Sequence, residues 1–155
     1  MGHLNDPAAS EQLWAGGYLH TGDVATCDAD GTIHIVDRIK DIIKSGGEWV
    51  SSIQVEDIIS EKSGVVKAAV IAVKDAKWGE RPMALVIVEP GFAGGSAEAV
   101  QEAIRAHVSS YVDKGVISKF AIPDRVEIVK ELPLTSVGKV DKTVLRERHL
   151  RDEAA

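Results

Sequence analysis

Two apolar runs in the middle of the chain, residues 65–73 and 83–88, constrain the fold more than any other feature of the sequence. A short apolar run bounded by charged or turn-forming residues is typical of a strand in the core of a sheet. The intervening residues 74–82 are mostly charged and are predicted to form a connecting loop. We therefore expect a β-sheet built around these two strands.

Helices are predicted on both sides of this pair of strands. Ser51 and Ser96 can each cap a helix N-terminus, and apolar residues follow both at helical spacing. Gly64 is predicted to end the first helix. Residues 124–129 predict a third core strand, and residues 143–150 predict a short terminal helix. The apolar faces of the two capped helices comprise Val55, Ile58, Ile59, Val100, Ile104, Val108 and Tyr111.

The first part of the chain predicts a separate β-hairpin. Residues 1–16 are expected to be a polar lead-in, followed by a strand over 18–27 and a return strand over 32–36. The Asp30-Gly31 pair supplies the positive φ that hairpin turns often need. After the hairpin the expected order is β-α-β-β-α-β-α. The predicted fold class is α+β, a small mixed β-sheet packed with helices and preceded by a β-hairpin.

Charge and composition narrow the functional classes. The 155 residues carry a formal net charge of −6, which disfavours a broad phosphate-neutralising surface and therefore a nucleic-acid partner. No apolar run approaches the roughly 20 residues that span a bilayer, and the N-terminus has no signal-peptide pattern. The single Cys27 fits a reducing compartment. We expect a cytoplasmic protein without a transmembrane segment.

Lys139 is the first candidate for catalysis. It follows Gly138 in a loop after Pro133, which can present an ammonium group without burying it. A lysine ammonium can stabilise a carboxylate and phosphoryl oxygens together. A Walker-type phosphate loop is excluded, because that pattern needs Gly in place of Pro133 and Ser or Thr in place of Val140. Taken alone, the segment is more typical of an exposed turn, since most lysines face solvent.

Residues 17–23 and 37–48 contain the candidates for ligand binding. Asp23 has two acceptor oxygens that suit the vicinal hydroxyls of a ribose. Arg38 offers a planar set of donors for hydroxyls or phosphate. Each segment alone is also typical of a surface turn rich in Gly and Asp.

The second of these segments also suggests movement and a ligand path. Lys40 lies in a charged break between two apolar parts of the chain, where hinge residues often occur. Gly46-Gly47 would let a thin ligand pass along the main chain. The alternative is a surface network of charged residues followed by a glycine turn.

In this order, the segments resemble those of the adenylate-forming acyl-CoA synthetases, which are related to luciferases and peptide-synthetase adenylation domains. Residues 17–23 match Gly-aromatic-x-x-Thr-Gly-Asp, residues 37–48 match Asp-Arg-x-Lys-Asp-x-Ile-Lys-x-Gly-Gly-Glu, and residues 133–139 match Pro-x-Thr-x-x-Gly-Lys. The chain resembles the C-terminal part of these enzymes from about Asn5 to Leu150. Its residues 49–52 and 77–82 look like those of medium- and long-chain fatty-acyl ligases.

The resemblance implies a role for each candidate residue. Asp23 would bind the ribose hydroxyls of ATP and AMP, with Arg38 assisting, and Lys40 would be the hinge of a rotating domain. Lys139 would contact the acyl carboxylate and the α-phosphate during adenylation. After rotation, Gly46-Gly47 would replace it and line the channel through which the pantetheine of coenzyme A enters.

The resemblance also implies a division of the chain. Residues 1–37 would be the tail of a large N-terminal domain, residues 38–41 a hinge and residues 42–155 a lid domain. The N-terminal domain would hold the acid and the Mg²⁺ that accompanies ATP. This chain is expected to bind no metal, since its histidines lack ligand spacing, and to be inactive when isolated.

Two alternative functions stay open at this point. The first is an adenylation domain that loads a carrier protein. The second is a regulatory or interaction module without catalysis.

Overall fold

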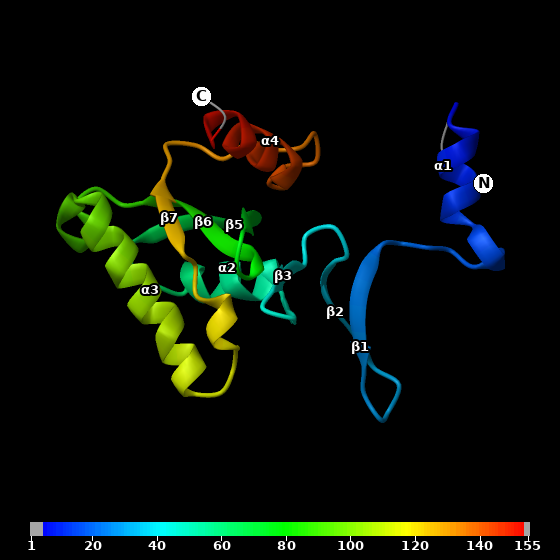
Figure 1. Ribbon diagram of the computed structural model, residues 1–155, viewed down its shortest axis with the longest axis horizontal. Coiled ribbons are helices and arrows are strands. Elements are labelled where there is room, and N and C mark those ends of the chain that lie inside the picture. Colours follow the sequence, from blue (N-terminus) through cyan, green and yellow to red (C-terminus); the bar gives the residue numbers. More distant parts are fainter. Residues whose placement is uncertain (1–4, 154–155) are drawn as a thin grey trace. The chain divides into compact units, whose positions relative to one another are not determined.

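The computed structural model describes residues 5–153, so the first residues of the predicted tail lie outside the described part. The chain forms two compact units, residues 1–40 and residues 41–155 (Figure 1). The predicted α+β class is confirmed by the elements of both units.

The first unit contains a short helix and a hairpin. Helix α1 (Pro7–Leu13) and a 3-10 turn (Ala15–Gly17) precede two antiparallel strands, β1 (Asp23–Cys27) and β2 (Ile33–Arg38). The hairpin was predicted, but β1 begins later and β2 ends later than expected.

The polar lead-in contains helix α1, which the sequence analysis did not predict. Asp6 caps α1 by accepting a hydrogen bond from the Ala9 backbone N–H at 2.9 Å, and Pro7 occupies the first turn. Both residues are typical of a helix start. Because α1 buries none of its residues, it has no apolar stripe that periodicity could detect.

The second unit is built on a five-stranded sheet. Its strand order is β4-β3-β6-β5, and β7 pairs with β6 in parallel. The strands are β3 (Ile43–Ser45), β4 (Glu48–Val50), β5 (Val65–Asp75), β6 (Gly79–Val88) and β7 (Arg125–Ile128). The two apolar runs of the sequence form β5 and β6, as predicted.

The charged loop predicted over 74–82 is mostly strand. Only residues 76–78 form the turn, and β6 already begins at Gly79. Pro82 lies opposite Ala72 in the ladder between β5 and β6. On its other side β6 pairs with β3 at Gly79 and with β7 only from Met83 onward, so Pro82 falls between two partners. A proline without an N–H is tolerated at such a gap.

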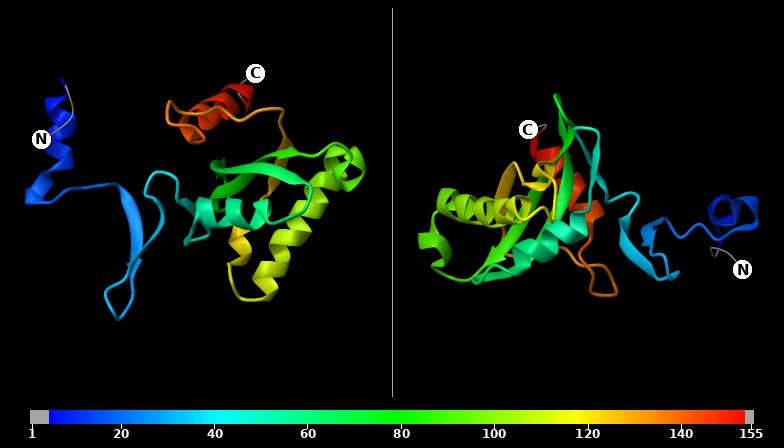
Figure 2. Two further views of the ribbon diagram at one scale, coloured as in Figure 1. Left: turned by 180° about the vertical axis from the view of Figure 1, so that it is seen from behind. Right: turned by 90° about the horizontal axis from the view of Figure 1, so that it is seen from below.

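Helices cover both faces of this sheet, and the apolar side chains of β5 and β6 alternate between the two faces (Figures 1 and 2). Helices α2 (Ser52–Ser60) and α3 (Ala97–Asp113) pack on one face and α4 (Lys142–Glu153) packs on the other. Burial on both faces explains why the two runs are apolar at successive positions. The larger cluster contains Val70, Val86 and Ile104, and the smaller one contains Ile71, Leu85 and Leu145.

The capping predictions are confirmed, whereas one helix end and one strand pair differ from expectation. The Ser51 hydroxyl accepts from the Gln54 N–H and the Ser96 hydroxyl from the Ala99 N–H, both at 3.1 Å. Helix α2 ends at Ser60, and Gly64 instead leads into β5 with a φ of +91°. The sequence also predicted one strand before α2, where the structure has the two short strands β3 and β4.

Candidate functional site

Asp23 and Arg38 are brought together by the hairpin of the first unit. They are opposite each other in the register of β1 and β2, and the Arg38 Nε lies 3.2 Å from the Asp23 Oδ1. The Asp23 side chain is 24% exposed and that of Arg38 is 56% exposed. The sequence placed these residues in two separate motifs and did not predict their ion pair. The predicted hairpin could have indicated this pair, because antiparallel pairing places residues on opposite sides of a turn next to each other.

Lys40 occupies an exposed turn at the end of the first unit. The preceding residue is held in that unit, because the Ile39 N–H donates to the Gly22 carbonyl at 2.9 Å. The following residue is held in the second unit, because Arg146 Nη1 donates to the Asp41 Oδ1 at 2.7 Å. Lys40 therefore lies between two anchored neighbours.

Gly46 and Gly47 form the two-residue turn between β3 and β4. Their φ angles are +60° and +83°, a combination that suits hairpin turns and that glycine adopts at little cost. The Gly46 N–H donates to the Trp78 carbonyl at 3.0 Å. A Cβ on Gly46 would overlap the Phe120 ring, whereas a Cβ on Gly47 would meet nothing within 4 Å. The turn is therefore supported on one side and open on the other.

Aromatic and basic side chains lie beside this turn. The rings of Trp78 and Phe120 meet edge to face with centroids 5.3 Å apart. The Lys77 Nζ lies 4.4 Å from the Trp78 ring centroid, and the Lys119 Nζ lies 5.4 Å from that of Phe120. Cations over aromatic faces add a modest attraction. The predictions did not include Phe120 or Lys119 in the site, because their proximity to the turn depends on the fold of the second unit.

Lys139 lies on an exposed hairpin-like loop between β7 and α4. Thr135 and Lys139 exchange hydrogen bonds, from the Thr135 N–H to the Lys139 carbonyl at 2.7 Å and from the Lys139 N–H to the Thr135 hydroxyl at 3.2 Å. Gly138 has a φ of +78° in this tight turn. Leu134 and Val140 close the loop as an antiparallel bridge. The loop is thus ordered while the Lys139 side chain faces solvent.

The base of the Lys139 loop is fixed by a half-buried ion pair. The Lys142 Nζ lies 2.8 Å from the Glu56 Oε1 and donates to the Ser52 hydroxyl at 2.7 Å. These Lys142 and Glu56 side chains are only 13% and 18% exposed. The Asp141 carboxylate accepts from the Thr143 and Val144 N–H groups at the start of α4. Lys142 is therefore an anchor of the loop.

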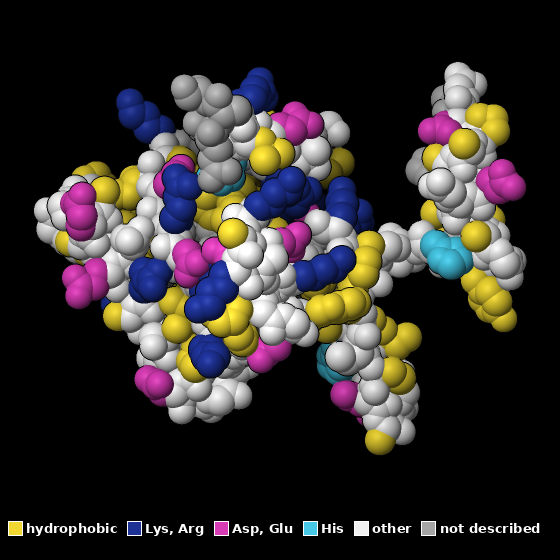
Figure 3. All heavy atoms as spheres, viewed as in Figure 1, with side chains coloured by type: hydrophobic (Ala, Val, Ile, Leu, Met, Phe, Trp, Pro, Cys, Tyr) yellow, Lys and Arg dark blue, Asp and Glu magenta, His cyan; other side chains and the backbone are white. Residues whose placement is uncertain are grey.

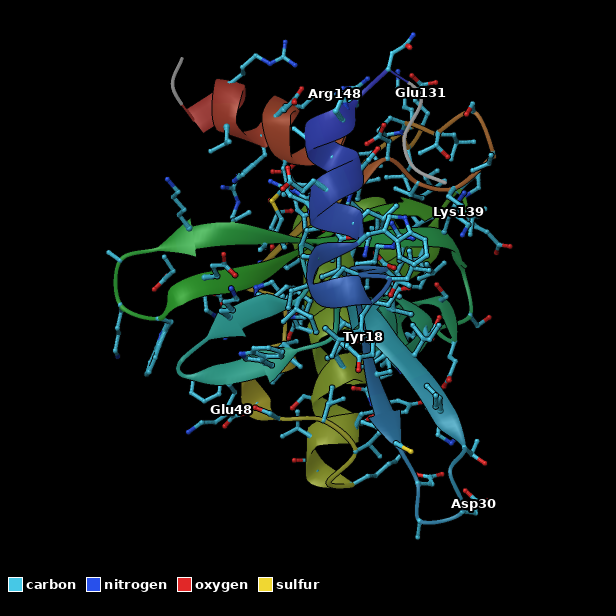
Figure 4. All side chains as sticks on the ribbon, turned by 90° about the vertical axis from the view of Figure 1, so that its right-hand side faces the viewer. Tyr18, Asp30, Glu48, Glu131, Lys139 and Arg148 are labelled. Carbon is cyan, nitrogen blue, oxygen red and sulfur yellow. The ribbon has the colours of Figure 1, made fainter. Side chains whose placement is uncertain are left out.

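The structure keeps two of the predicted site regions apart. Figure 4 labels Lys139 on its loop and Glu48 next to the Gly46-Gly47 turn, and the two labels mark separate parts of the second unit. On the face shown in Figure 3, Lys and Arg side chains are interspersed with Asp and Glu. Among residues 5–151, whose side chains the structure describes, there is no group of three or more His, Cys, Asp or Glu side chains placed to hold a metal ion.

A comparison with known protein families finds a match within the second unit. Residues 54–139 match the family described as AMP-binding enzyme C-terminal domain. The chain belongs to this family. The match begins inside helix α2 and ends at Lys139, so it covers most of the sheet and the loop that carries the lysine.

Curated members of this family are similar over nearly the whole chain. The 3-methylmercaptopropionyl-CoA ligase of Ruegeria pomeroyi is 43% identical over 89% of this chain and 24% of its own length. The medium-chain-fatty-acid–CoA ligase of Ectopseudomonas oleovorans is 42% identical over 86% of this chain and 22% of its own length. The chain thus spans about a quarter of the length of the relatives that it matches.

A solved structure supports the fold of this family member. The anthranilate CoA ligase AuaEII in complex with anthranoyl-AMP matches 99% of this chain and 28% of its own length, with a TM-score of 0.83 and 30% identity. The predicted resemblance to acyl-CoA ligases, including medium- and long-chain fatty-acid ligases, is confirmed. In the described part of the chain, none of the helices is both long and apolar enough to cross a membrane.

Proposed function

We propose that this chain is the C-terminal lid domain of an ATP-dependent acyl-CoA ligase, which converts a carboxylic acid, ATP and coenzyme A into acyl-CoA, AMP and diphosphate. The observation that carries the proposal is the placing of Lys139 and the Gly46-Gly47 turn on separate parts of one compact unit (Figure 4). A single active site with two half-reactions needs two sets of groups, and rotation of a domain supplies them in turn.

Lys139 serves the first half-reaction. The acid carboxylate attacks the α-phosphorus of ATP, the bond to diphosphate breaks, and an acyl-adenylate forms. Negative charge develops on the phosphoryl oxygens, and an ammonium placed between carboxylate and phosphate stabilises it. The ordered loop of Lys139, with its base tied to α2 through Lys142, supports this role because an oriented cation needs little reorganisation.

The Gly46-Gly47 turn serves the second half-reaction. The thiol sulfur of coenzyme A attacks the acyl carbon, its proton leaves, and AMP departs from the acyl group. Gly47 is open on one side, because a Cβ built there would meet nothing within 4 Å. This space leaves room for the narrow pantetheine arm along the main chain. Pantetheine amides can bond to backbone groups exposed in this way.

The first unit contributes to nucleotide binding and to the hinge. The Asp23 carboxylate accepts hydrogen bonds from the ribose hydroxyls, and the adjacent Arg38 orients it. Residues 1–37 are the tail of the N-terminal domain, residues 38–41 with Lys40 are the hinge, and residues 42–155 are the lid. The bonds that hold Ile39 and Asp41 on either side of Lys40 support a pivot at that residue.

The remaining substrates and ions are held by the N-terminal domain. That domain binds the acid and the Mg²⁺ that accompanies ATP, and the isolated chain is inactive without it. The relatives' names include different acids, so the acid used here stays open. We expect the enzyme to act in the cytoplasm.

Replacing the lysine tests the proposal. In the complete ligase that contains this chain, Lys139→Ala should slow acyl-adenylate formation by roughly 10²–10³-fold, as expected for loss of a group that stabilises developing charge. Thioester formation from supplied acyl-adenylate should stay unchanged. Lys130→Ala removes an exposed lysine earlier on the same connecting segment and serves as the control. Equal losses in both half-reactions would contradict the role given to Lys139.

Two measurements separate the alternatives. Transfer of the acyl group to free coenzyme A, compared with transfer to a phosphopantetheinyl carrier protein, distinguishes a ligase from a carrier-loading domain.

Titration calorimetry of the 155-residue chain with ATP tests the alternative of a non-catalytic module. We expect weak or no binding, because one carboxylate and two cations enclose little of the nucleotide. Tight binding by the isolated chain would favour an independent module.

A further inference from the structure

Arg81, on strand β6, has a side chain that is bonded to several segments of the second unit. It is 8% exposed and makes five hydrogen bonds. Since a guanidinium has five N–H donors, every donor is used. The acceptors are both Asp124 carboxylate oxygens, the Ser45 hydroxyl, and the Phe120 and Ile122 carbonyls, all between 2.8 and 3.1 Å.

These bonds join segments that support the Gly46-Gly47 turn. Ser45 is the last residue of β3 and directly precedes Gly46. Phe120 carries the ring on which Gly46 rests, and its carbonyl accepts from Arg81 at 2.9 Å. The guanidinium therefore holds both the strand that leads into the turn and the aromatic ring beneath it.

The backbone alone fixes this turn weakly. Strand β3 is three residues long, and its ladder with β6 contains only the pair Ser45 and Gly79, beside one backbone bond from the Gly46 N–H to the Trp78 carbonyl. So short a pairing leaves the position of the β3–β4 hairpin dependent on side chains. The Asp124 carboxylate completes the anchor on the other side, and its hydrogen bonds from Arg81 lower the pKa of Asp124 against the opposing effect of burial. It stays ionised and paired at neutral pH.

We infer that Arg81 is a positioning residue for the thioester-forming half-reaction, holding the Gly46-Gly47 turn where coenzyme A passes. This inference rests on the proposed function. Arg81 itself would not contact a substrate, because its side chain is buried. Arg81 would act independently of Lys139, because the Lys139 loop is anchored separately through Lys142 and Glu56.

The test compares both half-reactions in the complete ligase. Arg81→Lys keeps the positive charge and loses the fan of donors, and Ser45→Ala removes only the bond to β3. Both variants should lower the rate of acyl transfer to coenzyme A from supplied acyl-adenylate, by roughly 10²-fold for Arg81→Lys, because displacement of a positioning element by about 1 Å has an effect of this size. Acyl-adenylate formation should change by less than about threefold.

Arg105→Lys is the matched control. Arg105 also donates to backbone carbonyls near this segment, those of Pro123 and Asp124, but it has no contact with Ser45 or Phe120 among those described. Its replacement should leave both half-reactions unchanged. If Arg81→Lys fails to fold, the Ser45→Ala variant alone tests the positioning role, since it leaves the pair between Arg81 and Asp124 in place.

The outcomes distinguish the inference from the function on which it rests. Equal slowing of the two half-reactions by Ser45→Ala and Arg81→Lys, or unchanged acyl transfer in both, would overturn the positioning role and leave the ligase proposal intact. An unmodified enzyme that forms acyl-adenylate but transfers nothing to coenzyme A would overturn the proposed function and the inference with it.

Discussion

Glu56 lies where helix α2, helix α4 and strand β5 meet. Its Oε1 is 2.8 Å from the Lys142 ammonium and accepts from the Val70 N–H at 2.7 Å. Neither partner of the ion pair is well exposed to solvent. A pair of this kind stabilises the fold little more than two well-packed apolar residues would. Removal of one partner is costly, however, because it leaves the other charge poorly solvated.

We expect Glu56→Gln to destabilise the chain by about 2–4 kcal/mol, because the Lys142 ammonium would keep its place without a countercharge. Urea unfolding of the 155-residue chain measures the difference. Glu147→Gln, on the exposed face of α4, is the control and should change stability by less than about 0.5 kcal/mol. Similar midpoints for the two variants would show that the ion pair does not anchor the Lys139 loop.

At the scale of secondary structure, the β3–β4 hairpin depends on its two glycines for different reasons. Both have positive φ, but only Gly46 faces a neighbouring side chain, the ring of Phe120. A residue with a Cβ pays a conformational cost at either position, and at Gly46 it must also displace a ring that is packed against the core.

Gly46→Ala should therefore destabilise the chain more than Gly47→Ala, for which strain alone predicts about 1–2 kcal/mol. Thermal unfolding of both variants measures this order. In the complete ligase, Gly47→Ala should still slow acyl transfer to coenzyme A, because the added methyl group narrows the open side of the turn. The reverse order of stabilities would contradict the contact between Gly46 and Phe120.

At the scale of the whole molecule, the chain has two compact units that meet in sequence at Lys40. Ile39 is bonded within the first unit and Asp41 within the second. If the units rotate, the change in backbone dihedrals is concentrated at the residue between these anchors, as in many hinges.

Lys40→Pro should slow the thioester-forming half-reaction by roughly tenfold or more and spare adenylation, because proline restricts the φ angle of the pivot. Lys40→Ala retains a flexible backbone and should leave both rates near those of the unmodified enzyme. Rapid-quench measurement of each half-reaction provides the comparison. Unchanged kinetics with coenzyme A in Lys40→Pro would remove the hinge from the proposal.

The core strands and the helix caps could be predicted from the sequence, which also supplied the candidate site residues. The apolar runs that form β5 and β6, and the serines that cap α2 and α3, act over a few residues and leave a readable local pattern. Lys139, Asp23 and the two glycines were identified through motifs of fixed spacing, which local sequence also preserves.

Which of these residues come into contact depends on the tertiary fold. Residues 79–82, part of the predicted charged loop, form strand because they pair with β5, and Arg81 is an anchor because η3 (Lys119–Ala121) and β3 lie beside it. The pair of Glu56 with Lys142 likewise joins segments that are distant in the sequence. Register and packing set such contacts, and both depend on the free energy of the whole fold, which no short stretch of sequence contains.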